Sequence, residues 1–319
     1  MSDERVSFET QSSYRWLLPL MYVLAGWASF KKWCAHTLGY SVPNTNSWFF
    51  DGLAPKCRKI KEGAASWRAL TLLYNHPFRK PESFGAWLDN VWLMSPNAQA
   101  VRNRRKIAKN ELLKTILSLS LGGQEEVRIL SLACGSAEAV LDAVVEANKF
   151  GVRTQCFLID IDASALEYAR KVAEGLGIAD QVKTKRANLL GFERLGKIIA
   201  AYQPRIVEMM GLIDYVQDKH TVVLIKTIHD ALPVGGMFFT CNIIPNAERV
   251  FLKHVINWEM IYRKPGELVE IMSVAGFRNI RTIVENMNIH VIAIGAKEDR
   301  GQKKIPERSS VPIAEGMLQ

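Results

Sequence analysis

The apolar positions of the chain follow different patterns before and after about residue 95. Residues 1–95 combine short apolar runs with Trp and Pro and contain no convincing series of strands, so we expect a helical, irregular N-terminal accessory region. Ser95 followed by Pro96 predicts a helix start, because Ser is favoured at the N-cap and Pro in the first turn. Apolar side chains then recur at helical spacing until Gly122 and Gly123, which end the predicted helix.

From residue 127 onward, short apolar runs alternate with helical stretches, which is typical of βα units on a parallel sheet. The spacing of Ser164 and Glu167 matches a capping box and predicts that a helix starts there. The expected fold is α/β: a doubly wound, mostly parallel, seven-stranded Rossmann-like sheet over residues 96–296. Residues 297–319 are polar and patternless, and we expect a mobile tail. The predicted strands are 127–133, 154–160, 182–187, 205–210, 237–243, 278–285 and 290–296.

Composition limits the classes of function. The 319 residues carry 41 Lys and Arg against 32 Asp and Glu, and this charge of +9 could attract nucleic acid, an anionic membrane or an acidic small molecule, or form an ordinary basic surface. The basic cluster Arg102–Lys109 is typical of a solvated helix face. The five cysteines are scattered without a CxxC pair, which favours a reducing, cytoplasmic location without a metal site. The polar start of the chain is unlike a secretory signal.

The run Trp16–Phe30 is nearly all apolar and is followed by Lys31 and Lys32. It is shorter than the roughly 18–20 residues that a spanning helix needs, and Pro19 and Gly26 interrupt it. Two interpretations stay open: a helix that covers the domain, or an interfacial segment that makes peripheral contact with a membrane.

The turn after the first predicted strand is built from small residues, among them Ala133, Gly135, Ser136 and Ala137. In a doubly wound sheet this turn lets backbone N–H groups approach a ligand. Asp160 follows Gly135 by 25 positions (160 − 135), near the roughly 20-residue offset of a ribose-binding acid, whereas Asp162 is better placed to cap the next helix. The absence of GxGxxG argues against a dinucleotide-dependent dehydrogenase.

Four segments resemble motifs of the class I S-adenosylmethionine-dependent methyltransferases: ILSLACGSAEA, FLIDIDASALEYAR, RANLLGF and LPVGGMFFTCNI. The resemblance implies that S-adenosylmethionine is the cofactor. The chain departs from the family at Ser131, where an acid is usual, at Ala133 and Ala137, where glycines are usual, and at Asn188, where aspartate is usual. The resemblance implies a methionine site at Ala133, Cys134, Gly135 and Ser136, a ribose site at Asp160, and further cofactor contacts at Ile161, Asn188, Leu189 and Met210. Asn188 and Leu189 are expected to border the adenine.

The acceptor is less defined. The segments GLIDYV and NWEMIYRKPGEL, with NAQAVRNRRK upstream, more loosely resemble a bacterial subgroup that makes 3-hydroxy fatty acid methyl esters. This implies O-methylation of a small, lipid-like or carboxylate acceptor, with Arg263 pairing with the carboxylate and Tyr215 and Tyr262 lining the pocket. It assigns no catalytic base.

Two other functions stay open. The departures from the motifs allow a noncatalytic nucleotide-binding or membrane-associated module, and the charge allows an RNA methyltransferase. The loop at 208–215 lacks the Asn/Asp-Pro-Pro-aromatic tetrad, which argues against nucleic-acid amino groups as acceptors. No feature of the sequence indicates an oligomeric state.

Overall fold

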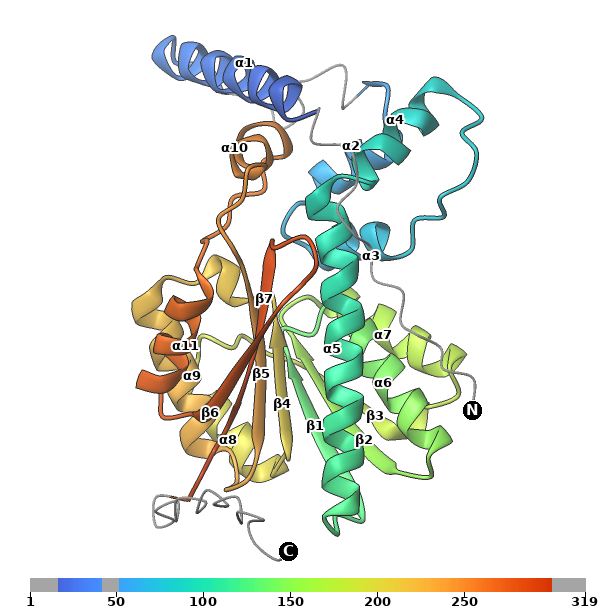
Figure 1. The fold of residues 1–319 in the computed structure, drawn as a ribbon, viewed down its shortest axis with the longest axis vertical. Helices are drawn as coiled ribbons and strands as arrows, with labels where there is room; N and C mark the ends of the chain where they lie inside the picture. Colours follow the sequence, from blue (N-terminus) through green and yellow to red (C-terminus); the bar gives the residue numbers. More distant parts are fainter. Residues whose placement is uncertain (1–16, 42–51, 300–319) are drawn as a thin grey trace, which may run out of the picture.

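A seven-stranded sheet forms the centre of the structure, a computed structural model that describes residues 17–41 and 52–299 (Figure 1). Its strand order is β3-β2-β1-β4-β5-β7-β6. All neighbours are parallel except β7, which runs antiparallel to both β5 and β6. The predicted fold class is therefore confirmed. The strands are β1 (Glu126–Leu132), β2 (Arg153–Asp160), β3 (Val182–Arg186), β4 (Ile206–Met210), β5 (Met237–Ile243), β6 (Arg278–Val284) and β7 (His290–Ala296).

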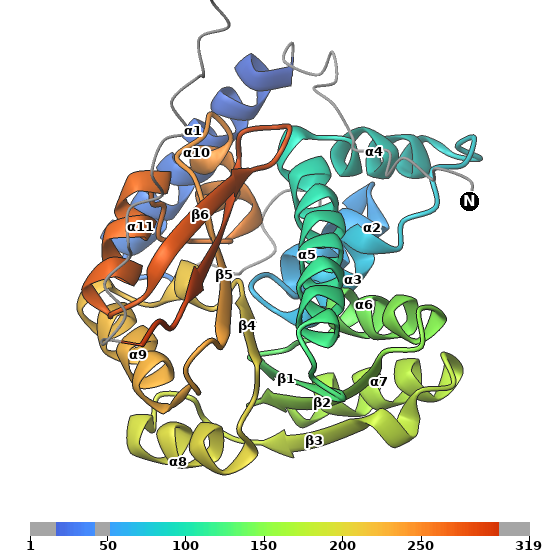
Figure 2. The same cartoon turned by 60° about the horizontal axis from the view of Figure 1, so that its bottom comes forward.

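Helices cover both faces of the sheet (Figures 1 and 2). On one face α5 (Pro96–Leu121), α6 (Glu138–Lys149) and α7 (Ala163–Gly175) pack on the strands and share a core that includes Leu112, Leu141 and Ile129. On the other face, α8 (Phe192–Tyr202), α9 (Asp218–Ala231) and α11 (Pro265–Val274) share a second core. Because β1, β4 and β5 are covered on both faces, their sequences are apolar runs rather than alternating ones.

Two helix starts differ in detail from the expectation. Helix α5 begins at Pro96 as predicted, but the Ser95 hydroxyl does not cap it; this oxygen is buried without a hydrogen-bond partner among the described residues. Helix α7 begins at Ala163, and its N-cap is Asp162, whose carboxylate accepts the Ser164 N–H at 2.8 Å. The prediction that Asp162 caps this helix is confirmed, and the capping box predicted at Ser164 is wrong, because Asp162 follows the strand directly and accepts one of the first free N–H groups.

The N-terminal region is helical, as expected, and lies over the carboxyl ends of the parallel strands (Figure 1). It comprises α1 (Leu18–Thr37), α2 (Pro55–Glu62), α3 (Trp67–Tyr74) and α4 (Phe84–Leu93). The segment that follows β5 joins this layer through α10 (Arg249–Phe251) and a π-helix (Leu252–Ile256). A third core of apolar side chains holds these elements together, with Ile60, Leu93 and Phe251 among its fully buried members.

Helix α1 has one packed and one open face. Leu17, Met21, Ala25 and Ala28 are buried in the third core. The outward side chains, in contrast, are large and apolar: Leu20, Tyr22, Val23, Trp27, Phe30 and Trp33. Trp16, the start of the apolar run, and residues 300–319 of the predicted tail lie outside the described residues. None of the helices in residues 17–41 and 52–299 combines the length and the apolar character that a bilayer-spanning helix needs.

The burial of α5 gives a stability prediction. Leu112 is fully buried on its sheet-facing side, whereas Leu121 at its end is 90% exposed. Leu112→Ala should lower the free energy of unfolding by about 2–5 kcal/mol, because it removes buried methyl groups and leaves a cavity. Leu121→Ala should change it by less than about 0.5 kcal/mol. Urea unfolding of both variants measures this difference, and equal losses would show that α5 is not docked on the sheet as described.

Candidate active site

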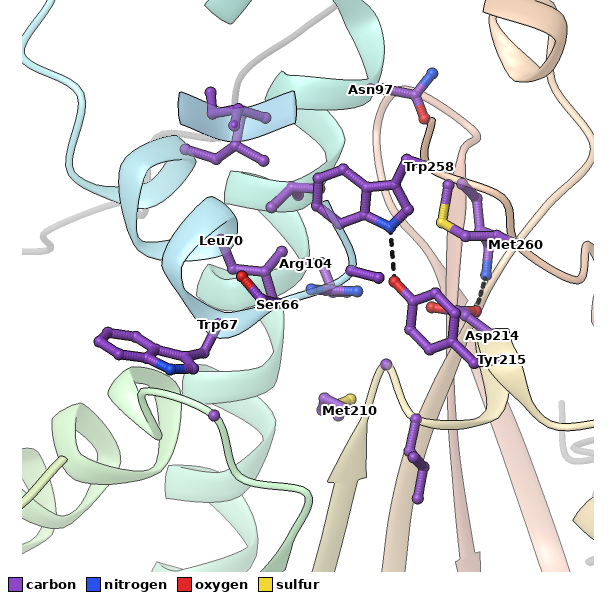
Figure 3. A pocket seen from close by; sticks show the side chains of 18 of the residues that line it. Ser66, Trp67, Leu70, Asn97, Arg104, Met210, Asp214, Tyr215, Trp258 and Met260 are labelled. Carbon is purple, nitrogen blue, oxygen red and sulfur yellow. Dashed lines mark hydrogen bonds between the residues drawn. The ribbon is translucent and has the colours of Figure 1, made fainter. Parts of the chain in front are cut away.

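A cavity of about 290 Å³ lies at the carboxyl edge of the sheet, beneath the N-terminal helices. The turn after β1 and the ends of β2 and β4 form one side of it. The other side is apolar and aromatic and comes from α3, α4, α5 and the π-helix, with Leu70, Leu73, Trp92, Leu252, Ile256 and Trp258. Figure 3 shows Trp67 on one side of this space and the Trp258–Tyr215 pair on the other.

The turn after β1 is held in an unusual backbone conformation. Ala133, Gly135 and Ala137 have φ angles of 51°, 53° and 53°, in the left-handed region that favours glycine. Two of the three positions are the alanines that replace the glycines usual in the methyltransferase motif, so the chain keeps the shape of the turn without those glycines. At Gly135 a Cβ atom would lie 3.3 Å from the Cβ of Trp67, so a side chain there would require Trp67 to move slightly.

The Asp160 carboxylate at the end of β2 fixes this turn. Its Oδ2 accepts the Gly135 N–H at 2.8 Å and its Oδ1 accepts the Asp162 N–H at 2.9 Å. Asp160 is buried but lines the cavity. A carboxylate oxygen can accept two hydrogen bonds, so both oxygens retain capacity for hydroxyl groups of a ligand.

The structure brings some of the predicted cofactor residues together and separates others. The cavity is lined by Ala133, Gly135, Asp160, Ile161 and Met210.

Four predicted cofactor residues lie outside the cavity lining: Cys134, Ser136, Asn188 and Leu189. Leu189 is buried in the second core, and Asn188 uses its side-chain oxygen to accept the Leu190 N–H at 3.0 Å within its own turn. Neither the local hydrogen bond of Asn188 nor the core contacts of Leu189 could be predicted from residue type alone.

A neighbouring strand places an acid beside Ser131, the position at which the first motif usually has one. Ser131 on β1 pairs in register with Glu208 on β4, and the Ser131 hydroxyl donates a hydrogen bond to the Glu208 carboxyl. The other oxygen of Glu208 accepts the Met210 N–H at 3.1 Å. Burial raises the pKa of Glu208 to about 7. The sequence signal for this residue is a single acid within an otherwise apolar strand.

Of the two tyrosines predicted to line the acceptor pocket, one lines the cavity and the other does not. Tyr215 lines the cavity, and its hydroxyl accepts the Trp258 indole N–H at 2.6 Å (Figure 3). Burial raises the pKa of Tyr215 above its ordinary value. Tyr262 is outside the cavity lining, and its hydroxyl is buried without a partner among the described residues.

The Arg263 guanidinium is fully used in contacts, mainly with the segment between β4 and the start of α9. It is buried, it donates to the carbonyl oxygens of Ile213 and Val216 at 2.7 and 2.6 Å, and it forms an ion pair with Asp218 at 2.7 Å. A further bond of 2.6 Å reaches the Asn242 side chain. This corrects the expectation that Arg263 pairs with an acceptor carboxylate, because its donors are already used and it does not line the cavity.

The buried polar residues of the cavity that were not predicted include three ionisable ones: Arg104 on α5, Asp214 after β4 and His290 at the start of β7. Asp214 accepts the Ile243 N–H at 2.9 Å, and burial raises the pKa of its carboxyl to about 6. Arg104 belongs to the basic cluster that was expected on a solvated face, and Arg102 beside it is buried as well. Helix α5 is enclosed along its first turns by the N-terminal layer, which the sequence pattern did not indicate.

The strand order, with β7 inserted antiparallel between β5 and β6, and a ligand cavity at the turn after β1 define the fold of the class I methyltransferases. S-Adenosylmethionine is the cofactor of that class. Residues 44–297 match the family described as "Putative methyltransferase". The chain belongs to this family and is a methyltransferase.

Solved structures show the same fold. A protein from Bordetella parapertussis, described as a possible exported protein, has a TM-score of 0.61 at 17% identity, with 90% of this chain and 98% of that chain covered. An O-methyltransferase family protein from Burkholderia thailandensis has a TM-score of 0.50 at 12% identity, with 88% and 72% covered. No curated protein matches the sequence.

The buried Glu208 predicts a pH effect on stability. Its pKa is about 7 in the folded protein against 4.5 as the ordinary value, so the folded protein binds more protons between these values. Its contribution to stability therefore falls as pH rises from about 4.5 to about 7 and is constant above that range. Glu208→Gln should reduce the loss in free energy of unfolding between pH 5 and pH 8, and Asp214 should account for part of the remaining loss.

The matched control is Glu193→Gln, which alters an exposed acid on α8 and should keep the pH dependence of the wild type. Urea unfolding at the two pH values measures the effect. A Glu208→Gln variant with the full wild-type loss would contradict the assignment.

Proposed function

We propose that the cavity binds S-adenosylmethionine at the turn after β1 and transfers its methyl group to an oxygen of a small, apolar acceptor. The observation that carries the proposal is that one cavity joins the cofactor turn to a chamber of apolar and aromatic side chains. Methyl transfer from a sulfonium is an in-line displacement, so holding the acceptor oxygen against the methyl carbon supplies most of the catalysis.

The cofactor end of the cavity suits a nucleoside with an amino acid tail. Asp160 has acceptor capacity for ribose hydroxyls, and Ile161 presents an exposed apolar side chain beside it. Trp67 covers the turn and is anchored by its indole N–H, which donates to Asp162 at 3.0 Å. Met210 at the end of β4 lies toward the acceptor side, where the sulfonium would face the chamber.

The acceptor end favours an apolar molecule. The side chains from the N-terminal layer and the π-helix are mainly Leu, Ile and Trp, and they would enclose an alkyl or aromatic body. This lining is a poor match for RNA, whose phosphates need an open basic surface. An acceptor carboxylate would need no general base, since it carries no proton to remove.

The cofactor assignment can be tested at Asp160. Asp160→Asn should weaken binding of S-adenosylhomocysteine about tenfold to a hundredfold, since a charged hydrogen-bond acceptor contributes about 1.5–3 kcal/mol. Asp142→Asn is the matched control, because Asp142 pairs with Arg105 on the face of the helix layer and does not line the cavity. Isothermal titration measures both. A wild-type protein without affinity for S-adenosylhomocysteine would favour the noncatalytic module instead.

We further propose that the outward face of α1 contacts an anionic membrane surface. Trp27, Phe30 and Trp33 are exposed and in ring contact, with centroids 6.2 and 6.1 Å apart, and Lys31, next to Phe30, is exposed as well. Lys32 is instead turned to the packed side, where it donates to the His254 carbonyl oxygen at 3.1 Å. Aromatic rings with an adjacent cation are suited to the headgroup level of a bilayer. The other face of α1 packs on the π-helix that lines the cavity, so a lipid-like acceptor would be close to its entrance.

This contact predicts lipid-dependent sedimentation. The wild type should sediment with vesicles of phosphatidylglycerol and phosphatidylcholine, and a Trp27→Ser, Trp33→Ser double variant should lose most of this binding. Phe150→Ser, at an exposed aromatic residue after α6, is the control and should bind like the wild type. Self-association of the wild type without vesicle binding, abolished by the double variant, would identify a second copy of the chain as the occupant.

A further inference from the structure

Arg104 brings a buried positive charge into the cavity. Its side chain extends from α5 and is only 5% exposed (Figure 3). Its recorded hydrogen bonds go to two uncharged groups, the Tyr74 hydroxyl at 3.2 Å and the Cys241 sulfur at 3.8 Å. Within the described part of the chain no carboxylate lies within ion-pair distance of it. A buried guanidinium without an anionic partner is costly, and it is suited to a carboxylate or another oxyanion.

His290 supplies a second polar group without a partner. Because β7 is antiparallel, its first residue lies at the cavity edge, opposite Ile243 at the end of β5. His290 is 3% exposed, and neither ring nitrogen has a hydrogen-bond partner among the described residues. Burial and the nearby charge of Arg104 lower the pKa of His290 well below its usual value. The ring is therefore neutral near pH 7 and has one N–H to donate.

None of the other groups described at this end of the cavity forms an ion pair with Arg104. Asp214 is near enough to favour the charge of Arg104, and its carboxyl, whose pKa burial raises to about 6, is negatively charged above that pH. It nevertheless lies beyond ion-pair distance of Arg104, and one of its oxygens accepts the Ile243 N–H. Tyr215 is engaged with Trp258. The guanidinium and the neutral histidine thus border the cavity without an ion pair, beside walls that are mainly apolar.

We propose that Arg104 and His290 form the subsite for the acceptor's acidic oxygen group, a carboxylate or a phenolate carried on an apolar body. This inference rests on the proposed methyl transfer. The guanidinium binds the oxyanion, and the imidazole N–H donates a second hydrogen bond. These are positioning residues: they hold the oxygen group while the apolar chamber holds the rest of the acceptor.

The reaction balances without a general base. The oxyanion attacks the methyl carbon of the sulfonium, the O–CH₃ bond forms and the S–CH₃ bond breaks. The electron pair of the broken bond stays on sulfur. The negative charge of the oxygen and the positive charge of the sulfonium disappear together, which gives a neutral methyl ester or ether and S-adenosylhomocysteine. A cavity that excludes water favours such charge neutralisation.

Binding of three probes of similar length, measured with S-adenosylhomocysteine present, tests the subsite: dodecanoate, an alkyl nitrophenol that is ionised at pH 8, and dodecanol. We expect at least one of the two anions to bind about tenfold to a hundredfold more tightly than dodecanol, as a charged hydrogen bond provides. The anion that binds identifies the source of the oxygen. Two anions that bind no better than the alcohol would overturn the proposal.

Variants then assign the residues. Arg104→Gln and His290→Phe should each remove most of the preference for the anion, whereas Arg104→Lys should retain part of it because it keeps the charge. Arg102→Gln is the control, since Arg102 is buried on the same helix, over the Phe78 ring, and does not line the cavity. Thermal unfolding confirms that each variant is folded, and His290→Phe keeps the test decisive if Arg104→Gln does not fold.

Binding of two cofactor analogues distinguishes a role of Arg104 in cofactor binding from its proposed role in acceptor binding. S-Adenosylhomocysteine carries an amino acid carboxylate, and methylthioadenosine does not. If Arg104→Gln weakens binding of the first and not of the second, Arg104 holds the cofactor and the acceptor subsite is wrong. Unchanged binding of both ligands, with loss of anion binding, supports it. Failure of the wild type to bind S-adenosylhomocysteine would instead contradict the proposed function itself.

Discussion

The hydrogen bonds that the Asp160 carboxylate accepts join the ends of two neighbouring strands, and the shape of the cavity depends on them. One oxygen holds the Gly135 N–H of the turn after β1, and the other holds the Asp162 N–H after β2. The left-handed backbone at Ala133, Gly135 and Ala137 would be unfavourable in isolation. It persists because Asp160 and the packing of Trp67 fix the turn from two sides.

The N-terminal layer makes this edge of the sheet into an enclosed site. A bare carboxyl edge would leave Arg104, Asp214 and His290 in contact with water, but the layer and the π-helix bury them. Burial explains both the raised pKa of Asp214 and the lowered pKa of His290, because a low-dielectric environment disfavours the charged form of each. The layer therefore contributes the electrostatics of the site as well as its apolar walls.

Much of the fold could be predicted from local pattern. Every strand starts and ends within one residue of its predicted limits. For β1, β4 and β5 the reason is that strands covered on both faces are short apolar runs bounded by turns. Asp160, Ala133 and Gly135 were predicted as cavity residues for a related reason, since strand ends and the turns after them lie at one edge of a parallel sheet. The capping box predicted at the start of α7 was wrong because two side chains that can cap a helix, Asp162 and Ser164, are only two residues apart.

The sequence by itself determined the sheet, its class and the position of the first turn, since these follow from periodicity and from motifs within about 35 residues of each other. Only the tertiary structure decided which polar side chains face the cavity. Arg263 is a reasonable partner for a carboxylate by residue type, but its N–H groups donate to acceptors in the loop after β4 and at the start of α9, 45 to 50 residues away in the sequence. Glu208, Arg104 and His290 gain their roles from strand register and from enclosure by distant helices. Strand register and enclosure by distant helices produce no periodic pattern in the sequence, because they depend on which segments pack together in the folded protein.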